Sequence, residues 1–597
     1  MASAVFTSIL PGIVPFRLPH AVGNILRKWL GIDDLERVYD GLRSMGEGRS
    51  IAERLVDSLS VSCVVSDVDL ARIPRTGATI LTINHPFGIL EGAVLAKILA
   101  GIRPDFRFLA NGLLSAVPEL RDLVIPVDPI SGSKAVAGNG SGLRRSLEHL
   151  ESGGMLVVFP AGEVSHFRWS DRRVADPEWN AAVARLVQIA ARRGLAATVV
   201  PAFVDGANSA LFQLSGLLHP RFRTALLGRE LLNKRGRRVE VRIGTPVASE
   251  KLLAIPTARE QVDYLRWRTY LLARRERYKP MTSRPLAAPA NCRRQPVAAA
   301  VPAETLAAEI AGLPNDALLN RSGDLEVYLA GAEAMPNVLR EIGRLREITF
   351  RAAAEGTGKP LDLDEFDRHY VHLFVWHARR QEIVGAYRLG GTERGRDRGL
   401  YTATLFHYGP DFLDRIGPAL ELGRSFVRQE YQKGFAPLLL LWKGIGSYVA
   451  RNPRYKILFG PVSISDQYQA ISRELMVGFL EKYAMLGNLS GMIRGRRTPR
   501  RASRDAFPSS GFDVEDLSGL ISDIEEKPSG VPVLLRQYLR LGGKLLGFHV
   551  DAQFGNTLDG LILVDLTKTE PKLLDRYLGK AEAAAILAYQ KGAYATH

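Results

Sequence analysis

The chain has 597 residues, 46% of them hydrophobic, and a formal net charge of +16 at pH 7. This length and hydrophobic content are ordinary for globular proteins and suffice for at least two cores. The two cysteines, Cys63 and Cys292, exclude a disulfide framework and indicate a reducing, cytoplasmic setting.

The positive charge predicts an anionic partner, such as a membrane surface, nucleic acid or an acidic protein. We find no zinc-finger spacing and no recognisable nucleic-acid-binding motif, so we expect neither a metal nor a nucleic acid. No run of eighteen uncharged apolar residues occurs, so no membrane-spanning helix is expected. The segment 18–30, with Arg27 and Lys28 among apolar residues, either lies in a membrane interface or packs as an N-terminal helix.

In chain order, a helix beginning at residue 51 is predicted to run into a strand over 61–68. An apolar strand over 78–83 follows and stops in a turn at Pro86 and Gly88. Its end presents His85, and Glu91 comes shortly after. A carboxylate that fixes the tautomer of a histidine makes it a general base for a hydroxyl group. The structural alternative is a histidine that only hydrogen-bonds a carbonyl. The pair needs the turn, because on an ideal helix the two side chains would point roughly 240° apart.

Strands and helices then alternate. Strands are predicted over 106–111, 123–128, 154–159, 197–203 and 239–243, and helices over 93–99, 142–151 and 261–278. This alternation indicates an α/β layer fold with its site at the strand ends. Arginines and lysines from Arg221 to Arg238 follow, which suggests an anionic lipid or an acidic carrier as partner, or else a solvated basic face.

Three motifs of this half resemble those of the glycerolipid acyltransferase family, of the lysophosphatidate acyltransferase type. They are Asn84-His85 followed by an acid, Phe159–Ser165 and Val199–Phe203, and together they cover residues 50–250. The resemblance implies that His85 is the catalytic base, assisted by Glu91. It also implies substrate binding by Asn84, Pro160, Gly162 and Glu163.

The chain departs from that family in three places. Glu91 lies one residue later than the usual acid, and Ala161 stands where the second motif has its glutamate, for which Glu163 is the nearest replacement. The arginine expected near residues 123–128 to hold a phosphate is missing, and Asp128 stands near its place. The last departure argues against a plain glycerol-phosphate acceptor.

Residues 279–304 are rich in proline and alanine and poor in large apolar residues, which predicts a linker. We therefore divide the chain into a first domain over 1–278, the linker over 279–304 and a second domain over 305–597.

The second domain is predicted to begin with a strand over 325–329, a helix over 338–350 and two strands over 371–376 and 382–389. This order resembles the acetyltransferase (GNAT) superfamily. The finer pattern resembles a branch that includes acyl-homoserine-lactone synthases and ornithine-lipid N-acyltransferases. The residues that carry this resemblance are Arg346, Phe350, Asp364, Asp367, Val384–Arg388 and Glu421–Ser425.

The resemblance implies that Glu421 or Asp364 assists deprotonation of an amine, while Arg388 and Arg424 order the acidic residues and the acyl donor. Arg346 and Asp367 would bind substrate with them. Each of these acids and arginines alone would also fit a surface ion pair.

The acetyl-CoA members of the superfamily hold pyrophosphate in a Gln/Arg-x-x-Gly-x-Gly/Ala loop. The nearest match here, Tyr431–Ala436, lacks the leading Gln or Arg. We therefore expect no bound cofactor and an acyl carrier protein as donor. A loop with six arginines is suited to an acidic carrier protein or membrane lipid, or is merely solvated; they are Arg494, Arg496, Arg497, Arg500, Arg501 and Arg504.

The whole arrangement resembles the bifunctional ornithine-lipid synthases. It implies that the second domain N-acylates an amino acid with a 3-hydroxyacyl group and that the first domain O-acylates the resulting lyso-lipid. Ornithine is the expected amino acid, with glycine, glutamine and lysine open. The expected location is cytoplasmic, peripheral on the inner face of the membrane. The alternatives are a glycerolipid or lysophospholipid acyltransferase with an auxiliary second domain, and a non-catalytic lipid- or carrier-binding protein.

Overall fold

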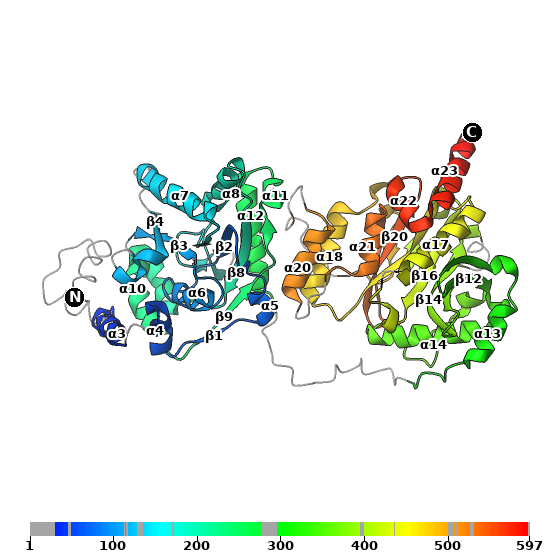
Figure 1. Ribbon diagram of the computed structural model, residues 1–597, viewed down its shortest axis with the longest axis horizontal. Helices are drawn as coiled ribbons and strands as arrows, with labels where there is room; N and C mark the ends of the chain where they lie inside the picture. The colour runs from blue at the N-terminus through cyan, green and yellow to red at the C-terminus, as the bar shows by residue number, and fades with distance from the viewer. Residues whose placement is uncertain are drawn as a thin grey trace. The chain divides into compact units, whose positions relative to one another are not determined.

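The computed structural model describes residues 30–594, except 46–48, 113, 115–116, 128–134, 170–171, 219, 276–294, 394–398, 435, 500–506, 508–511 and 526–529. The chain forms two compact units (Figure 1). The first comprises Met1–Glu276 and Asp505–Pro528, and the second comprises Arg277–Arg504 and Ser529–His597. The predicted boundaries at 278 and 304 stay a prediction. The prediction placed all of residues 305–597 in the second domain, whereas residues 505–528 belong to the first unit.

The first unit is built on a largely parallel sheet with the strand order β1-β9-β8-β2-β5-β3-β4. Its strands are β1 (Ser62–Val64), β2 (Thr79–Ile83), β3 (Phe106–Asn111), β4 (Val124–Val127), β5 (Met155–Val158), β8 (Thr198–Val204) and β9 (Arg238–Ile243), with β10 (Val247–Ala248) paired to β8. All five residues of β2 are buried, as expected of a central parallel strand covered on both faces. Parallel pairing brings the carboxyl ends of β2, β5 and β8 to one edge.

Helices cover both faces of this sheet. On one face α4 (Ile51–Ser58), α6 (Leu90–Ala100) and α10 (Pro220–Leu232) contribute to a core with Leu81, Val157 and Val200. The helices α7 (Ala135–Glu151), α8 (Ala182–Arg192) and α12 (Ala258–Leu272) lie on the other face (Figure 1). The remaining helices of this part are α3 (Ile32–Ser44), α5 (Asp67–Leu70), α9 (Ala210–Leu218) and α11 (Ser249–Leu253).

The second unit is built on a mostly antiparallel sheet with the strand order β11-β12-β13-β14-β16-β17-β20-β19. Its strands are β11 (Leu318–Ser322), β12 (Leu325–Gly331), β13 (Val371–His377), β14 (Glu382–Gly391), β16 (Ala419–Val427), β17 (Ile457–Ile464), β19 (Lys544–Asp551) and β20 (Thr557–Asp565). The one parallel pair, β16 and β17, is hydrogen-bonded only from Ala419 to Glu421, opposite Ile457 to Phe459. The paired register of the two strands ends at Glu421 and Phe459.

Two long helices pack on opposite faces of the second sheet. On one face α14 (Pro336–Ala352) joins α13 (Ala303–Ala311) in a core with Phe374, Ala386 and Phe426. On the other face α17 (Ala436–Arg451) packs against β11 to β14 and is backed by α22 (Pro571–Leu578) and α23 (Lys580–Tyr594). The two sheets, each covered by helices, confirm the predicted two-domain α/β class.

Most predicted strands are present within one to three residues. The helix predicted over 142–151 begins earlier, at Ala135, and the helix predicted over 261–278 spans Ala258–Leu272. The strand predicted over 61–68 is wrong in its second half. Only Ser62–Val64 is strand, because the Ser66 hydroxyl accepts a hydrogen bond from the Asp69 N–H at 3.1 Å and starts α5. The predicted segment 18–30, Asp128 and most of the linker fall outside the described residues, apart from Leu30 and 295–304.

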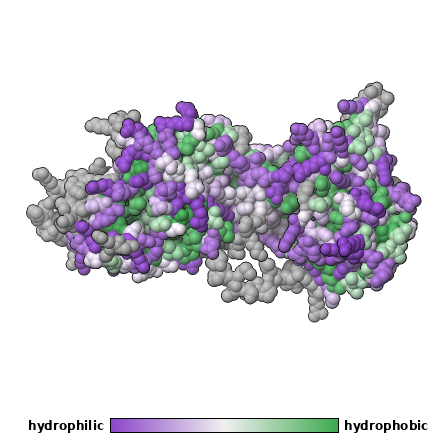
Figure 2. Space-filling view, viewed as in Figure 1, coloured by the Kyte–Doolittle hydropathy of each residue, from purple (hydrophilic) through white to green (hydrophobic). Residues whose placement is uncertain are grey.

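No helix among the described residues combines the length and apolar character needed to cross a bilayer. In the view of Figure 2, hydrophilic side chains dominate the visible surface and hydrophobic patches interrupt it.

Candidate active sites

The first candidate site lies at the carboxyl end of β2. His85 Nδ1 is 2.8 Å from Glu91 Oε1, and the same oxygen accepts hydrogen bonds from the backbone N–H groups of Phe87 and Gly88 at 3.0 and 2.9 Å. Gly88 has φ = +98°, and a Cβ there would lie 2.7 Å from a methyl group of Leu227. The turn therefore needs glycine, and it brings the two side chains together.

Glu91 is fully buried in the first turn of α6. Burial by itself would raise its pKa, but the nearby imidazole and the hydrogen bonds from His85 and Gly88 outweigh burial and lower the pKa. An ionised Glu91 stabilises the tautomer of His85 that carries its proton on Nδ1. Nε2 is then a proton acceptor, and no hydrogen-bond partner for it lies among the described residues.

A second buried carboxylate, Asp176, holds the backbone around His85. Its Oδ1 accepts hydrogen bonds from the His85 N–H at 3.1 Å and from the Ser165 hydroxyl at 2.5 Å, and its Oδ2 accepts one from Trp179 Nε1 at 2.8 Å. Burial raises the pKa of Asp176. The sequence analysis missed this residue, because it lies 91 positions after His85 and belongs to no motif.

Asn84 was predicted to bind substrate, but its amide group is engaged with the backbone. Its Nδ2 donates to Val204 O at 2.9 Å, and its Oδ1 accepts from Val204 N–H at 2.7 Å. Both side-chain polar atoms therefore join the end of β2 to the end of β8. This geometry gives Asn84 a positioning role beside His85.

The loop after β5 provides the other predicted residues. Pro160 O accepts a hydrogen bond from the Asn180 N–H at 2.9 Å, and the Gly162 N–H donates to Phe159 O at 3.0 Å. The Gly162 amide is thus used in a turn, whereas the neighbouring amides of Ala161 and Glu163 have no acceptor among the described residues. The Glu163 side chain is 61% exposed and forms an ion pair with Arg223 at 3.7 Å. Its replacement of the motif glutamate at Ala161, and its substrate binding, stay predictions.

The second candidate site is a buried cluster of arginines and aspartates. Arg346 Nη1 lies 2.8 Å from Asp367 Oδ1, and Arg388 Nη1 lies 2.5 Å from Asp364 Oδ1 and 3.3 Å from Asp367 Oδ1. Asp367 is buried, which would raise its pKa, but the guanidinium groups of Arg346 and Arg388 lower it. The predicted residues from α14, β14 and the turn before β13 therefore meet in one place.

Arg424 completes this cluster from β16. Its Nη2 lies 3.6 Å from Asp364 and its Nε 3.4 Å from Asp362, which are loose ion pairs. The guanidinium lies 4.9 Å from the ring centres of both Tyr401 and Phe554. Several donors of the cluster have no acceptor among the described residues, namely Arg346 Nε, Arg388 Nε and Nη2, and Arg424 Nε. Buried unsatisfied donors are costly, so an anionic or carbonyl group would be bound well here.

Glu421 is the last residue of β16 in the paired register with β17. It is buried, which raises its pKa, and it accepts hydrogen bonds from the Tyr370 hydroxyl and from the Thr402 N–H, the latter at 2.7 Å. Both oxygens are occupied, so Glu421 positions Tyr370 and the turn at Thr402. The Asp364 side chain, 25% exposed, is the more accessible of the two predicted acids.

Two further carboxylates near this cluster were missed. Asp559 on β20 is buried and accepts a hydrogen bond from the Ser463 hydroxyl of β17 at 2.8 Å. Burial, together with Asp551, raises its pKa to about 7, and burial together with Asp559 raises that of Glu355 to about 7. The sequence contains a pattern that could have indicated Asp559, because this aspartate stands inside the largely apolar segment 557–565.

Comparison with known proteins defines the class first. The acyltransferase family matches residues 25–276, and the acetyltransferase (GNAT) domain family matches residues 345–443. The protein is thus an acyltransferase with two different acyltransferase domains.

Individual relatives narrow this class. A glycine N(α)-acyltransferase of Bacteroides thetaiotaomicron is 33% identical over 283 residues, which are 44% of this chain and 83% of the relative. A glycine N(α)-acyltransferase of Phocaeicola vulgatus is 32% identical over 45% of this chain and 88% of its own length. An L-ornithine N(α)-acyltransferase of Rhodobacter capsulatus is 28% identical over 41% of this chain and 92% of its own length. The two glycine N(α)-acyltransferases are more than 30% identical to this chain over most of their length, so the chain belongs to the same family as these N(α)-acyltransferases.

Proposed function

We propose that this protein makes a diacylated amino-acid lipid by two consecutive acyl transfers. The observation that carries the proposal is that two different acyltransferase domains on one chain each contain a cluster of buried polar residues. One cluster is the His85–Glu91 pair at the end of β2, and the other is the arginine–aspartate cluster around Asp364 and Arg388.

The second domain acts first in this scheme. The α-amine of an amino acid attacks the thioester carbonyl of a 3-hydroxyacyl carrier protein, the C–N bond forms, the C–S bond breaks and the carrier leaves as a thiol. Asp364 takes the proton that the amine loses and passes it to the leaving thiolate, and Glu421 positions Tyr370 and the turn beside it. Arg388 and Arg424 bind the substrate carboxylate or the donor carbonyl. Asp367, which also pairs with Arg346, holds Arg388, and Asp362 holds Arg424.

The first domain then acylates the 3-hydroxyl group of the lyso-lipid. His85 Nε2 removes the hydroxyl proton as the oxygen attacks a second thioester, and Glu91 stabilises the imidazolium that forms. The amides of Ala161 and Glu163 are the available donors for the oxyanion, since the Gly162 amide is already engaged. The histidine then protonates the leaving thiolate.

The proposed donor is an acyl carrier protein, with no bound cofactor. The chain lacks the leading Gln or Arg of the pyrophosphate-binding loop at Tyr431–Ala436, and its net charge of +16 suits an acidic carrier.

We propose that the protein binds peripherally to a membrane surface, on its cytoplasmic side. Three large apolar side chains near the first site support this: Trp169 is 72% exposed, Leu214 60% and Phe222 53%. The Phe167 N–H donates to Gln213 Oε1 at 2.8 Å, which ties the strand leading to Trp169 to the helix that carries Leu214. Exposed tryptophan, leucine and phenylalanine beside cations are typical of interfacial binding.

Glycine and ornithine are the two candidate amino acids. The more similar relatives are named for glycine, at 33% and 32% identity, and the others for ornithine, at 28% or less. Ornithine is favoured by the buried Asp559, near Arg424, and the half-buried Glu355, because these carboxylates with raised pKa values would gain a counter-ion from a second ammonium group.

The test is a reaction of the purified full chain with 3-hydroxyacyl carrier protein and either glycine or ornithine, followed by mass spectrometry. We expect an N-acyl product of one amino acid, which gains a second acyl group on further incubation. Acyl transfer to lysophospholipid alone would contradict the proposal and favour a glycerolipid acyltransferase.

A further inference from the structure

One segment from the second half of the chain packs within the first unit. Residues Asp505–Pro528 interrupt the second unit, yet they belong to the first. The described part of this arm contains Phe507 and the helix α20 (Val514–Ile524), whose N-terminus is capped by Asp513 in a capping box with Asp516.

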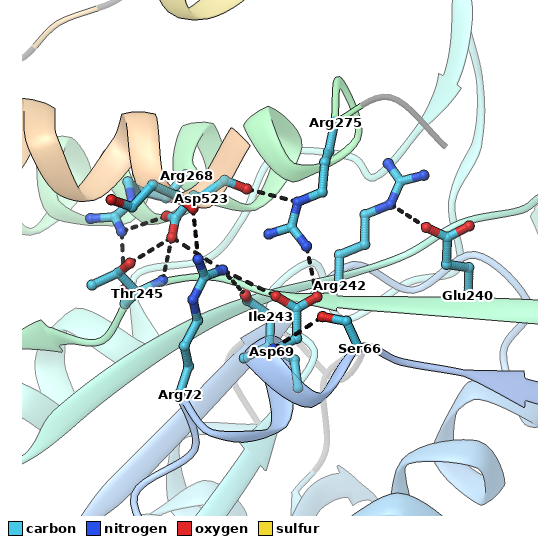
Figure 3. A network of polar contacts seen from close by, with 11 residues as sticks. Ser66, Asp69, Arg72, Glu240, Arg242, Ile243, Thr245, Arg268, Arg275 and Asp523 are labelled. Carbon is cyan, nitrogen blue, oxygen red and sulfur yellow. Dashed lines mark hydrogen bonds and ion pairs between the residues drawn. The ribbon is translucent and has the colours of Figure 1, made fainter. Parts of the chain in front are cut away.

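Asp523, at the end of α20, is the polar centre of the arm (Figure 3). Its Oδ1 accepts hydrogen bonds from the N–H and the hydroxyl of Thr245 at 2.7 and 2.6 Å, and its Oδ2 accepts one from Arg268 at 2.9 Å. Arg72 lies 3.4 Å from the same carboxylate, and only 2% of the Asp523 side chain is exposed.

The arm backbone is held by the same surface. Arg275 Nε donates to Asp523 O and Arg72 Nη2 donates to Ser522 O, each at 2.7 Å. Arg72 and Arg275 also pair with a carboxylate from the N-terminal part of the chain. Asp69 lies 3.1 Å from Arg72 and 2.7 Å from Arg275. Without the arm, Arg72 and Arg275 would share Asp69, and Arg268 would lose its ion pair with Asp523. Leaving these largely buried guanidinium groups with one carboxylate between them is unfavourable, so the surface favours binding of a second carboxylate.

Aromatic packing extends this contact. Trp267 of α12 meets Phe507 and Phe512 of the arm, with ring centres 5.5 and 6.3 Å apart, and Tyr264 meets Phe512 at 6.3 Å. Both phenylalanines are buried. Lys251 adds an ion pair with Asp516 at 2.5 Å at the edge. Stable interfaces typically have buried aromatic side chains at the centre and charged side chains at the edge.

The described residues that precede the arm belong to the second unit. The Arg496 N–H donates to Leu405 O and its side chain donates to Ala403 O, each at 3.0 Å. These carbonyls follow Thr402, whose N–H donates to Glu421. The described part of the arginine loop therefore contacts the turn after Thr402 within the second unit. Its docking of an acidic carrier protein or membrane lipid, or its being merely solvated, stays a prediction.

We propose that Phe507 and residues 512–525 form an intramolecular latch, by which the second half of the chain binds the α12–β9–α5 surface of the first domain independently of the linker. The observations that carry it are the buried Asp523–Arg268–Thr245 contact and the burial of Phe507 and Phe512 against Trp267. The inference does not rest on the proposed reaction. It implies that cutting at the linker does not separate the two acyltransferase domains.

The experiment inserts a specific protease site between Pro285 and Pro289 of the full chain, cuts it and measures size by light scattering at low micromolar concentration. The two fragments of the wild-type chain should remain together as one particle. Asp523→Ala should weaken their association by at least about 30-fold, the loss expected when one member of a buried charge pair is removed. Glu151→Ala, which removes an exposed ion pair with Arg193, is the matched control and should change nothing.

Phe512→Ala is a second variant, and it serves if Asp523→Ala does not fold as judged by circular dichroism of the uncut chain. Separation of the wild-type fragments after cleavage would overturn the latch. Fragments that stay together equally well in wild type and in both variants would overturn it too, because the association would then not use the arm.

Discussion

His85 Nδ1 and Glu91 Oε1 lie 2.8 Å apart, although six positions on a continuous helix would point the two side chains away from each other. The turn through Gly88, with its positive φ, makes the pair possible. The same carboxylate oxygen also accepts the Phe87 and Gly88 amides, so the orientation of Glu91 is fixed before any substrate binds.

Glu91→Gln should lower the rate of O-acylation by about 10²–10⁴-fold, the range that a general base and its support contribute. The neutral amide cannot stabilise the imidazolium, and it permits the wrong tautomer. The rate is measured with purified protein, lyso-lipid and acyl carrier protein, with Glu151→Gln as a surface control. An unchanged rate at Glu91→Gln would show that the pair is structural.

Asp176→Ala should destabilise the first domain by about 3 kcal/mol or more. It leaves the His85 N–H, the Ser165 hydroxyl and the Trp179 N–H without their acceptor, each at a cost of about 1–3 kcal/mol. Urea unfolding monitored by tryptophan fluorescence reports this change. A midpoint equal to that of the wild type would contradict the positioning role.

Arg388→Met should abolish N-acylation and destabilise the second domain by about 3–5 kcal/mol, because Asp364 and Asp367 lose a buried partner. Arg388→Lys should not restore activity, since an ammonium group lacks the planar fork that contacts both carboxylates. The readout is N-acyl product and thermal unfolding. Full activity of the lysine variant would contradict this account of the cluster.

Asp559 should make the second domain less stable as pH rises. Its pKa is raised by burial from 3.8 to about 7, so over this interval the folded state retains a proton that the unfolded state has released. The contribution of Asp559 to the free energy of unfolding is therefore fully present below pH 4, and it is lost as pH rises towards 7. Asp559→Asn should flatten the fall in unfolding free energy between pH 5 and 7.5. The exposed Asp324→Asn should leave the slope unchanged, and an unaltered slope in Asp559→Asn would refute the prediction.

Trp169→Ser with Leu214→Ser should reduce binding of the full chain to vesicles that contain anionic lipid. Each exposed apolar side chain loses the free energy of burial in the interface, about 1.5–3 kcal/mol. Cosedimentation at two salt concentrations separates this loss from the electrostatic part. Equal binding of the variant and the wild type would place the membrane contact elsewhere.

Local sequence patterns were sufficient for the strands and for part of each site. The apolar run ending at His85, the turn residue Gly88 and the order of Arg346, Asp364, Asp367, Arg388 and Glu421 all lie in contiguous patterns, and the structure brings each group together. The strand predicted over 61–68 failed because a serine cap, Ser66, outweighed apolar alternation.

Contacts between distant positions could not be predicted from one sequence. Asp176 reaches His85 across 91 residues, and Asp523 reaches Thr245 across 278. A buried aspartate and an exposed one look the same in sequence, since burial is decided by tertiary packing. The hydrogen bonds of Asn84 and Gly162 to backbone groups were hidden for the same reason.

The most direct test of the central claim is mass spectrometry of lipids from a bacterial host that lacks amino-acid lipids, expressing wild type, His85→Ala or Glu421→Ala. We predict a diacyl amino-acid lipid from the wild type, accumulation of the mono-acylated lyso form with His85→Ala, and neither lipid with Glu421→Ala. Altered phospholipid acyl chains without any amino-acid lipid in the wild type would contradict the account.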